Sequence, residues 1–390
     1  MKNLVQGNIY KTFFLFALPM ILSGVLSQAM GMVNTLIAGQ FLGEAGLAAT
    51  GSTGALTTFC SSMFWGFSAG FGVYIARLFG AREYESIRTA VRSYLLFVGT
   101  ATVFISLLCV ALCNPLLGWL RVDAAVRADA RIYLLIWMAA FPLHIMTNSG
   151  VVLLNALGLS GYPFCVSLTS SVLGVCGNLL TVAVLGWGVA GIALSSLLAS
   201  LTATVCYLIK LRACYREMKL PPRRFSITFM PIRASLPYTL PAAGQQMTMY
   251  LANMVLAPIV NGVGRSASAA YVVVQQIYSL NASIYQNSSK TLSNYAAQCL
   301  GQDAPPDVQR GHLHRGLLVG LAQGMLLALP LLALCVIFPE RTAALFLRSD
   351  DTQATAALLV TFIRFYLPFI LLNLLNNLFH SLYRGVGAMR

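Results

Sequence analysis

The sequence has few charged residues, and its long apolar stretches contain no carboxylate in their interiors. Only 9% of the 390 residues are charged and 58% are hydrophobic, whereas a typical soluble domain is about 25% charged. A soluble domain of this length has too little interior to bury so much apolar surface. We therefore predict an all-α polytopic membrane protein, because helices satisfy their own backbone hydrogen bonds in lipid.

The acidic residues are confined to connecting segments and to the ends of apolar stretches. They are Glu44, Glu83, Glu85, Asp123, Asp129, Glu217, Asp303, Asp307, Glu340, Asp350 and Asp351. The predicted membrane interior therefore lacks the residue type that most often couples an ion to transport.

Sites that depend on clustered ligands are also missing from the sequence. The nine cysteines are scattered and form no C-x-x-C pair, so their spacing is not that of a zinc site. We interpret them as small apolar packing residues and expect no metal and no cofactor other than a coupling H⁺ or Na⁺. Without a convergent cluster of acid, base or metal ligands, we expect no enzyme.

Ten apolar stretches are long enough to cross a bilayer. They cover approximately residues 13–38, 47–76, 92–113, 131–155, 163–184, 189–209, 234–261, 267–298, 316–338 and 353–383. With the N-terminus inside, seventeen of the twenty-five basic residues fall in inner segments and six in outer ones. This positive-inside asymmetry predicts a multi-pass protein of the cell membrane with both chain ends cytoplasmic. The outer loops are then 39–46, 114–130, 185–188, 262–266 and 339–352, and the basic segments contact lipid head groups and not nucleic acid.

Short motifs recur along the chain at separations of 218 to 227 residues. Trp119-Leu-Arg-Val-Asp123 matches Phe346-Leu-Arg-Ser-Asp350, Leu78-Phe-Gly80 matches Cys299-Leu-Gly301, and Ala17-Leu-Pro19 matches Ser235-Leu-Pro237. Because six spans separate equivalent points, both halves start on the same side of the membrane. Parallel repeats around a central site are typical of transporters.

The repeat predicts a first lobe at 1–209, a basic cytoplasmic linker at 210–233 and a second lobe at 234–390. The first lobe has six spans and the second has four, so ten of the twelve spans of two parallel six-helix repeats are present. We interpret the second lobe as truncated: either the sequence is a fragment or the gene ends early. We favour a shortened sequence, because an incomplete lobe leaves helix faces without protein neighbours.

Several segments also resemble a known family. They are Leu18-Pro19 with Val33-Asn-Thr-Leu-Ile-Ala-Gly39, Leu42-Gly-Glu-Ala-Gly-Leu-Ala-Ala49, Ala76-Arg-Leu-Phe-Gly-Ala-Arg82, Asn155-Ala-Leu-Gly158 and Tyr383-Arg-Gly-Val-Gly387. In order and spacing they resemble the multidrug and toxic compound extrusion (MATE) family, in the branch of the DinF and MepA proteins. The resemblance implies a V-shaped protein of two six-helix lobes that exports amphipathic, often cationic compounds by alternating access, in exchange for H⁺ or Na⁺. The alternatives are a flippase of lipid-linked sugars and a degenerate, uncoupled relative.

The chain departs from this family at its embedded acids. The family often has Asp at the position of Asn34, and again four residues after Asn178, where Val182 stands. One branch has acids near the positions of Gln245 and Asn373. None of these acids is present, so the coupling ion stays open between H⁺ and Na⁺.

The ionisable residues inside the spans are candidates for function, because they are costly there. His144 is a candidate to carry the coupling proton, or else an imidazole hydrogen-bonded between helices. Lys290 and Arg364 are candidates to face the central cavity, where they would bind anionic head groups or repel cations. Lys290 can alternatively extend to the inner surface.

Further polar residues in the spans either line a hydrated pathway or bond helices together at roughly 0.6 kcal/mol each. In addition to Asn34, Asn178, Gln245 and Asn373, the candidates are Gln246, Gln275, Asn281 and Asn377. Tyr271, Tyr278 and Tyr285 recur every seven residues, which suits stacking on a planar substrate or ordinary packing. Pro19 and Pro237 are candidate hinges. As partners we expect membrane lipids and a small amphipathic substrate, and we expect a monomer.

Overall fold

The computed structural model describes residues 4–5, 7–119, 126–218, 228–263, 265–346 and 353–388. Over these ranges the chain is helical and has no strand, which confirms the predicted all-α class. The helices are α1 (Ile9–Gly80), α2 (Tyr84–Ala111), α3 (Cys113–Trp119), α4 (Arg127–Ala156), α5 (Gly161–Asn178), the π-helix η1 (Leu179–Val184), α6 (Gly188–Glu217), α7 (Met230–Val263), α8 (Arg265–Gly301), α9 (Pro306–Ile337), α10 (Pro339–Phe346), α11 (Gln353–Tyr366), the 3₁₀ turn η2 (Leu367–Phe369) and α12 (Ile370–Val386).

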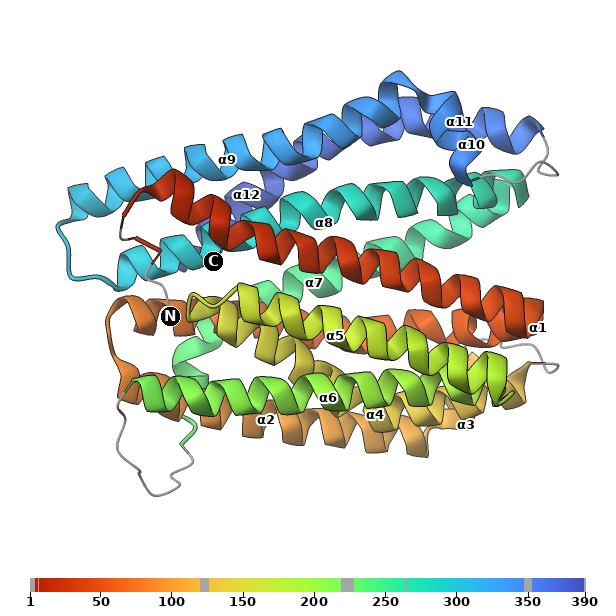
Figure 1. Cartoon of the computed structure of the whole chain (residues 1–390), viewed down its shortest axis with the longest axis horizontal. Helices are drawn as coiled ribbons and strands as arrows, with labels where there is room; N and C mark the ends of the chain where they lie inside the picture. Colours follow the sequence, from red (N-terminus) through yellow and green to blue (C-terminus); the bar gives the residue numbers. More distant parts are fainter. Residues whose placement is uncertain are drawn as a thin grey trace.

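Most of these helices run along the long axis of the molecule, as expected for membrane-spanning segments (Figure 1). Among the described residues, eight segments are long and apolar enough to cross a membrane. They are Ile9–Gly43, Leu56–Gly80, Tyr84–Ala111, Arg127–Ala156, Gly161–Val184, Gly188–Glu217, Pro306–Ile337 and Ala356–Val386. The chain is therefore a multi-pass membrane protein. Helices α7 and α8 are as long, at 34 and 37 residues, but carry more polar side chains.

The first two spans belong to one long helix, α1, which is interrupted at a single residue. Only Gly43 leaves helical geometry, with φ 63° and ψ −158°, a conformation that a residue with a Cβ rarely adopts. The predicted outer loop 39–46 is therefore wrong, because the chain changes direction at one glycine and needs no open loop. The predicted hinge Pro19 lies within regular helix.

The other predicted connections differ from open loops as well. The predicted outer segments 114–130 and 339–352 contain the short helices α3 and α10. The tenth predicted span is divided by η2 into α11 and α12, because Pro368 has no backbone N–H for a continuous helix. The centre of the predicted linker, 219–227, lies outside the described residues, as do 120–125 and 347–352.

Buried apolar residues form two main clusters, and α1 contributes to both. The larger cluster joins the second half of α1 with α2, α4, α5 and α6. The second joins α8, α9, α11 and α12 with Phe13, Phe16 and Met20 from the first half of α1. A third, small cluster places Ile37 and Ala38 of α1 beside η1 and α6. The first half of α1 therefore crosses from one bundle to the other, while the lobe limits 1–209 and 234–390 stay a prediction.

Candidate functional site

Two repeat-related contacts close the end of the molecule at which the two termini lie (Figure 1). The backbone at Gly80 lies so close to the carbonyl of Gln298 that a Cβ would not fit, and Gly301 has the same relation to the carbonyl of Arg77. Gly80 and Gly301 are 221 residues apart, as are Arg77 and Gln298. The two halves therefore meet through equivalent residues, as expected for parallel repeats related by an axis between them.

The same relation continues along the helices. Gly70 on α1 lies directly against the carbonyl of Tyr238 on α7. The equivalent residues of the other repeat, Thr291 on α8 and Met20 on α1, are joined by a hydrogen bond from Oγ1 to Sδ of 3.7 Å. Thus α7 packs on the second half of α1, and the first half of α1 packs on α8.

Side chains strengthen the closed end. Arg77 donates a hydrogen bond to the hydroxyl of Tyr238 at 2.6 Å. Gln298 is fully buried; it accepts from the N–H of Leu4 at 2.9 Å and donates to the carbonyl of Ala156 at 3.1 Å. Three segments far apart in sequence therefore meet on Gln298.

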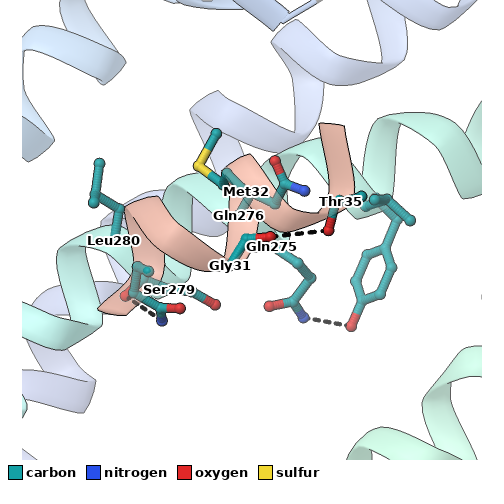
Figure 2. A pocket seen from close by; sticks show the side chains of 10 residues that line it. Gly31, Met32, Thr35, Gln275, Gln276, Ser279 and Leu280 are labelled. Carbon is teal, nitrogen blue, oxygen red and sulfur yellow. Dashed lines mark hydrogen bonds between the residues drawn. The ribbon is translucent and has the colours of Figure 1, made fainter. Parts of the chain in front are cut away.

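A cavity of about 490 Å³ lies farther from this closed end, between the first half of α1 and α8 (Figure 2). It is lined by Gln28, Gly31, Met32, Thr35, Tyr271, Val272, Gln275, Gln276, Ser279 and Leu280. Gln28 donates across the two helices to the carbonyl of Ser279 at 3.3 Å. The mixture of amides, hydroxyls and apolar side chains suits a small amphipathic ligand.

A hydrogen-bonded network extends from the cavity wall into the second bundle. Gln275 donates to the hydroxyl of Tyr271 at 2.5 Å and to that of Tyr366 on α11 at 3.4 Å. The structure thus places the predicted candidate Gln275 at the cavity, with its amide held by two tyrosines.

The predicted tyrosine stripe of α8 continues this network toward α12. The hydroxyl of Tyr285 donates to that of Tyr278 at 3.2 Å. Asn373 donates to Tyr278, and Asn377 donates to the side-chain oxygen of Asn373 at 2.7 Å. Asn373 and Asn377 therefore belong to one network with the stripe, and the seven-residue spacing reflects one face of α8 packed on α11 and α12.

Asn34 and Asn178, far apart in sequence, form a direct pair. The Nδ2 of Asn178 donates to the Oδ1 of Asn34 at 2.8 Å, and the Oδ1 of Asn178 is buried with no partner among the described residues. The pair stands at the start of η1, and π-helical turns are frequent at functional sites. Val182 on η1 packs in a small apolar cluster. Two neutral amides therefore occupy this site.

His144 is held between α4 and α6. Its Nδ1 lies 2.7 Å from the hydroxyl oxygen of Ser200, and its Nε2 lies 3.3 Å from that of Ser196. The ring also stacks on Trp137 at 5.4 Å between centroids. A neutral imidazole satisfies this arrangement by donating to one serine and accepting from the other.

A pair of cations lies between α8 and α12. Lys290 is exposed, although every other residue from 281 to 300 is buried or half-buried. Its Nζ donates to the Oδ1 of Asn287 at 3.2 Å. Arg384 donates to the Oε1 of Gln245 on α7 at 2.7 Å. Arg384 directly follows the predicted span 353–383, and it is not among the predicted site residues. The signal that would identify it is the helical register that carries α12 on to Val386.

The remaining candidates lie apart from these groups. Arg364 is exposed and forms an ion pair of 2.7 Å with Glu340 on α10. Asn281 is buried and donates to the carbonyl of Ile277 at 3.4 Å. Gln246 is half-buried on α7, and Pro237 is exposed on the same helix.

Comparison with known proteins agrees with this architecture. The MatE family model matches residues 19–180 and 241–390. The probable multidrug resistance protein YoeA of Bacillus subtilis (strain 168) is 23% identical over 356 residues, which cover 89% of this chain and 75% of that protein. The uncharacterized transporter YisQ of the same organism is 24% identical over 90% of this chain and 77% of its own length.

Solved structures show the same fold. A structure described as the outward-facing conformation of a multidrug resistance MATE transporter superposes with a TM-score of 0.90 at 19% identity, over 100% of this chain and 86% of that one. A transporter from Pyrococcus furiosus, described as having a binding pocket of reverse polarity, superposes with a TM-score of 0.89 at 19% identity over the same shares. The chain therefore belongs to the MATE family of multi-pass membrane transporters.

Proposed function

We propose that this transporter exports small amphipathic molecules from the cell by alternating access. The observation that carries the proposal is the pairing of a closed end with a cavity. Repeat-related residues close the end that holds the termini, and a cavity of about 490 Å³ lies beyond them between α1 and α8. In this arrangement the two halves rock about the repeat axis, and the cavity faces one side at a time. The multidrug resistance description of a relative supports the export direction.

The orientation follows from charge. The segments at the closed end contain Arg77, Arg82, Lys210 and Arg310, and cytoplasmic segments carry an excess of basic residues. We therefore place both ends of the chain in the cytoplasm and the protein in the cell membrane. The cavity then belongs to an outward-facing state.

Coupling is proposed as antiport with H⁺ or Na⁺. The Asn34–Asn178 pair is neutral, so it cannot exchange a proton, and a hard cation such as Na⁺ usually prefers a carboxylate to amide oxygens. His144 is the side chain in the first six spans whose ordinary titration range is near neutrality. It is therefore the proposed proton carrier.

The test is ethidium efflux from energised cells that express the chain. The proton gradient and the sodium gradient are collapsed separately with selective ionophores, and cells without the protein serve as the control. Efflux that stops with one gradient identifies the coupling ion. Absence of efflux under all conditions would contradict drug export and favour an uncoupled relative.

A second function is favoured by one observation. Lys290 and Arg384 have no carboxylate partner among the described residues, and such a basic site suits the anionic head group of a lipid-linked sugar. A flippase of such lipids is therefore the alternative, and movement of a fluorescent anionic lipid between leaflets distinguishes it from ethidium export.

A further inference from the structure

We infer that Lys290 and Arg384 form a binding site for an anionic group, a carboxylate or a phosphate, carried by the transported molecule. The inference rests on the proposed function in one respect, which is that the molecule bound there is a transport substrate. It differs from the proposed function in naming the charge of that substrate.

The first support is the accessibility of Lys290 at a depth where charge is costly. The residue lies eleven positions before the end of α8, which is about 16 Å along a helix. Its neighbours from 281 to 300 are buried or half-buried, and Lys290 alone among them is exposed. A charged side chain at this depth normally faces a water-filled cavity or a partner. Lys290 is therefore accessible at a depth where a ligand or a partner is expected to compensate its charge.

The second support is that the two cations lack a counter-charge. Gly385, the residue after Arg384, packs against the backbone of Ser293, which lies three residues along α8 from Lys290. The two cations therefore lie near each other, and like charges in a poorly solvated site repel each other. The ion pairs among the described residues join Arg88 to Glu85, Lys210 to Glu217 and Arg364 to Glu340. Neither Lys290 nor Arg384 takes part in one. An anion between them relieves the repulsion.

The third support is unused hydrogen-bonding capacity. The Nε of Arg384 is buried and has no hydrogen-bond partner among the described residues. Lys290 has three N–H donors, and its hydrogen bond to Asn287 occupies one of them. Carboxylate and phosphate oxygens are the acceptors that guanidinium and ammonium groups bind most strongly.

Neighbouring residues hold the two cations in place. Gln245 on α7 accepts from Arg384 and fixes one edge of its guanidinium. Asn287 accepts from Lys290, and it fits there because Gly24 on α1 has no Cβ to obstruct its amide. Four helical segments therefore converge on the site, and only amides, which carry no charge, support it. A cationic group would be repelled between Lys290 and Arg384, which do not line the cavity between α1 and α8.

The test uses two dyes that share a xanthene ring but differ in charge. Binding of anionic fluorescein and cationic rhodamine 123 to the purified full chain is measured by fluorescence anisotropy. We expect Lys290→Met and Arg384→Gln each to weaken fluorescein binding by about tenfold or more, because a hydrogen bond to a charged group contributes about that factor. Binding of rhodamine 123 should not weaken. Arg364→Gln is the matched control, since it removes a cation that pairs with Glu340 on the surface.

A second arm separates a soluble anion from a lipid. Fluorescent phosphatidic acid and phosphatidylcholine are compared in nanodiscs with the same variants. Dependence on Lys290 for phosphatidic acid but not for fluorescein identifies a lipid head group, and the reverse identifies a soluble anion.

The inference is overturned if the wild-type chain binds neither anionic probe, or if both substitutions leave the affinities unchanged. Gradient-dependent ethidium efflux with unchanged anion affinity would refute the site and leave the proposed function standing. Lys290-dependent anion binding without ethidium efflux would support the site and refute the proposed function.

Discussion

At the scale of the residue, the site is defined by the replacement of acids with amides. Asn34 and Asn178 meet at 2.8 Å, and an aspartate at position 34 would accept the same hydrogen bond. We therefore expect Asn34→Asp to fold normally and to make ethidium efflux depend more steeply on the proton gradient, because the new carboxylate titrates. Efflux is measured at a series of external pH values. Asn34→Leu is the control, and identical pH profiles for wild type and Asn34→Asp would refute the expectation.

His144 offers a complementary test. We expect His144→Ala to abolish pH-driven efflux. His144→Gln retains hydrogen-bonding capacity toward Ser196 and Ser200 without a titratable ring, so it separates proton transfer from simple helix contact. If His144 carries the proton, both variants lose pH-driven efflux. Retained efflux with an unchanged pH profile in His144→Gln would show that the imidazole only bonds α4 to α6. Melting temperatures of the purified variants report any loss of folding.

At the scale of the element, two glycines control how closely the helix ends approach. A methyl group at Gly80 or Gly301 would overlap a backbone carbonyl, so we expect Gly80→Ala to separate the closed end. The natural reporter is Cys299, which is buried beside this contact. Its labelling by a membrane-impermeant thiol reagent applied from the side of the closed end should become faster, as measured by peptide mass spectrometry. Gly311→Ala on α9 is the control, because a Cβ there meets nothing.

The break in α1 gives a second prediction for an element. Gly43 has a positive φ that a residue with a Cβ rarely adopts. We expect Gly43→Ala to destabilise the protein by about 1–3 kcal/mol, the usual cost of such strain, with a lower melting temperature. Gly51→Ala, on the same helix and with open space around it, is the control. Equal melting temperatures would show that α1 bends elsewhere.

The elements also show what a single sequence can predict. Apolar length and helical composition are enough to identify eight of the ten predicted spans, because a lipid environment requires both. The repeat motifs identified Gly80 and Gly301 as equivalent but not as contacting residues. A one-residue break at Gly43 could not be distinguished from a loop, since three glycines lie between 39 and 46. The pairing of Asn34 with Asn178 and of Arg384 with Gln245 depends on helix packing, which leaves no local signal.

At the scale of the whole molecule, α1 and α7 hold the two bundles together by crossing between them. Helix α7 packs on the second half of α1, and the first half of α1 packs on α8. Gly70 therefore contacts Tyr238, and the equivalent residues Thr291 and Met20 contact each other. Such an interlocked interface can rotate about the repeat axis without separating the halves. The rocking expected of a transporter is then a change at the closed end, with the crossed helices as its pivot.

Locking this closed end is therefore expected to stop transport. The side chains of Arg77 and Tyr238 meet at 2.6 Å, so Arg77→Cys and Tyr238→Cys together can be joined by a flexible bifunctional methanethiosulfonate reagent. The link prevents α1 from rotating against α7 at this end, and ethidium efflux should cease until a reducing agent releases the link. Each single variant with the same reagent controls for modification of the native cysteines. Continued efflux from the linked double variant would mean that substrate does not pass between these two helices, and alternating access about this axis would have to be abandoned.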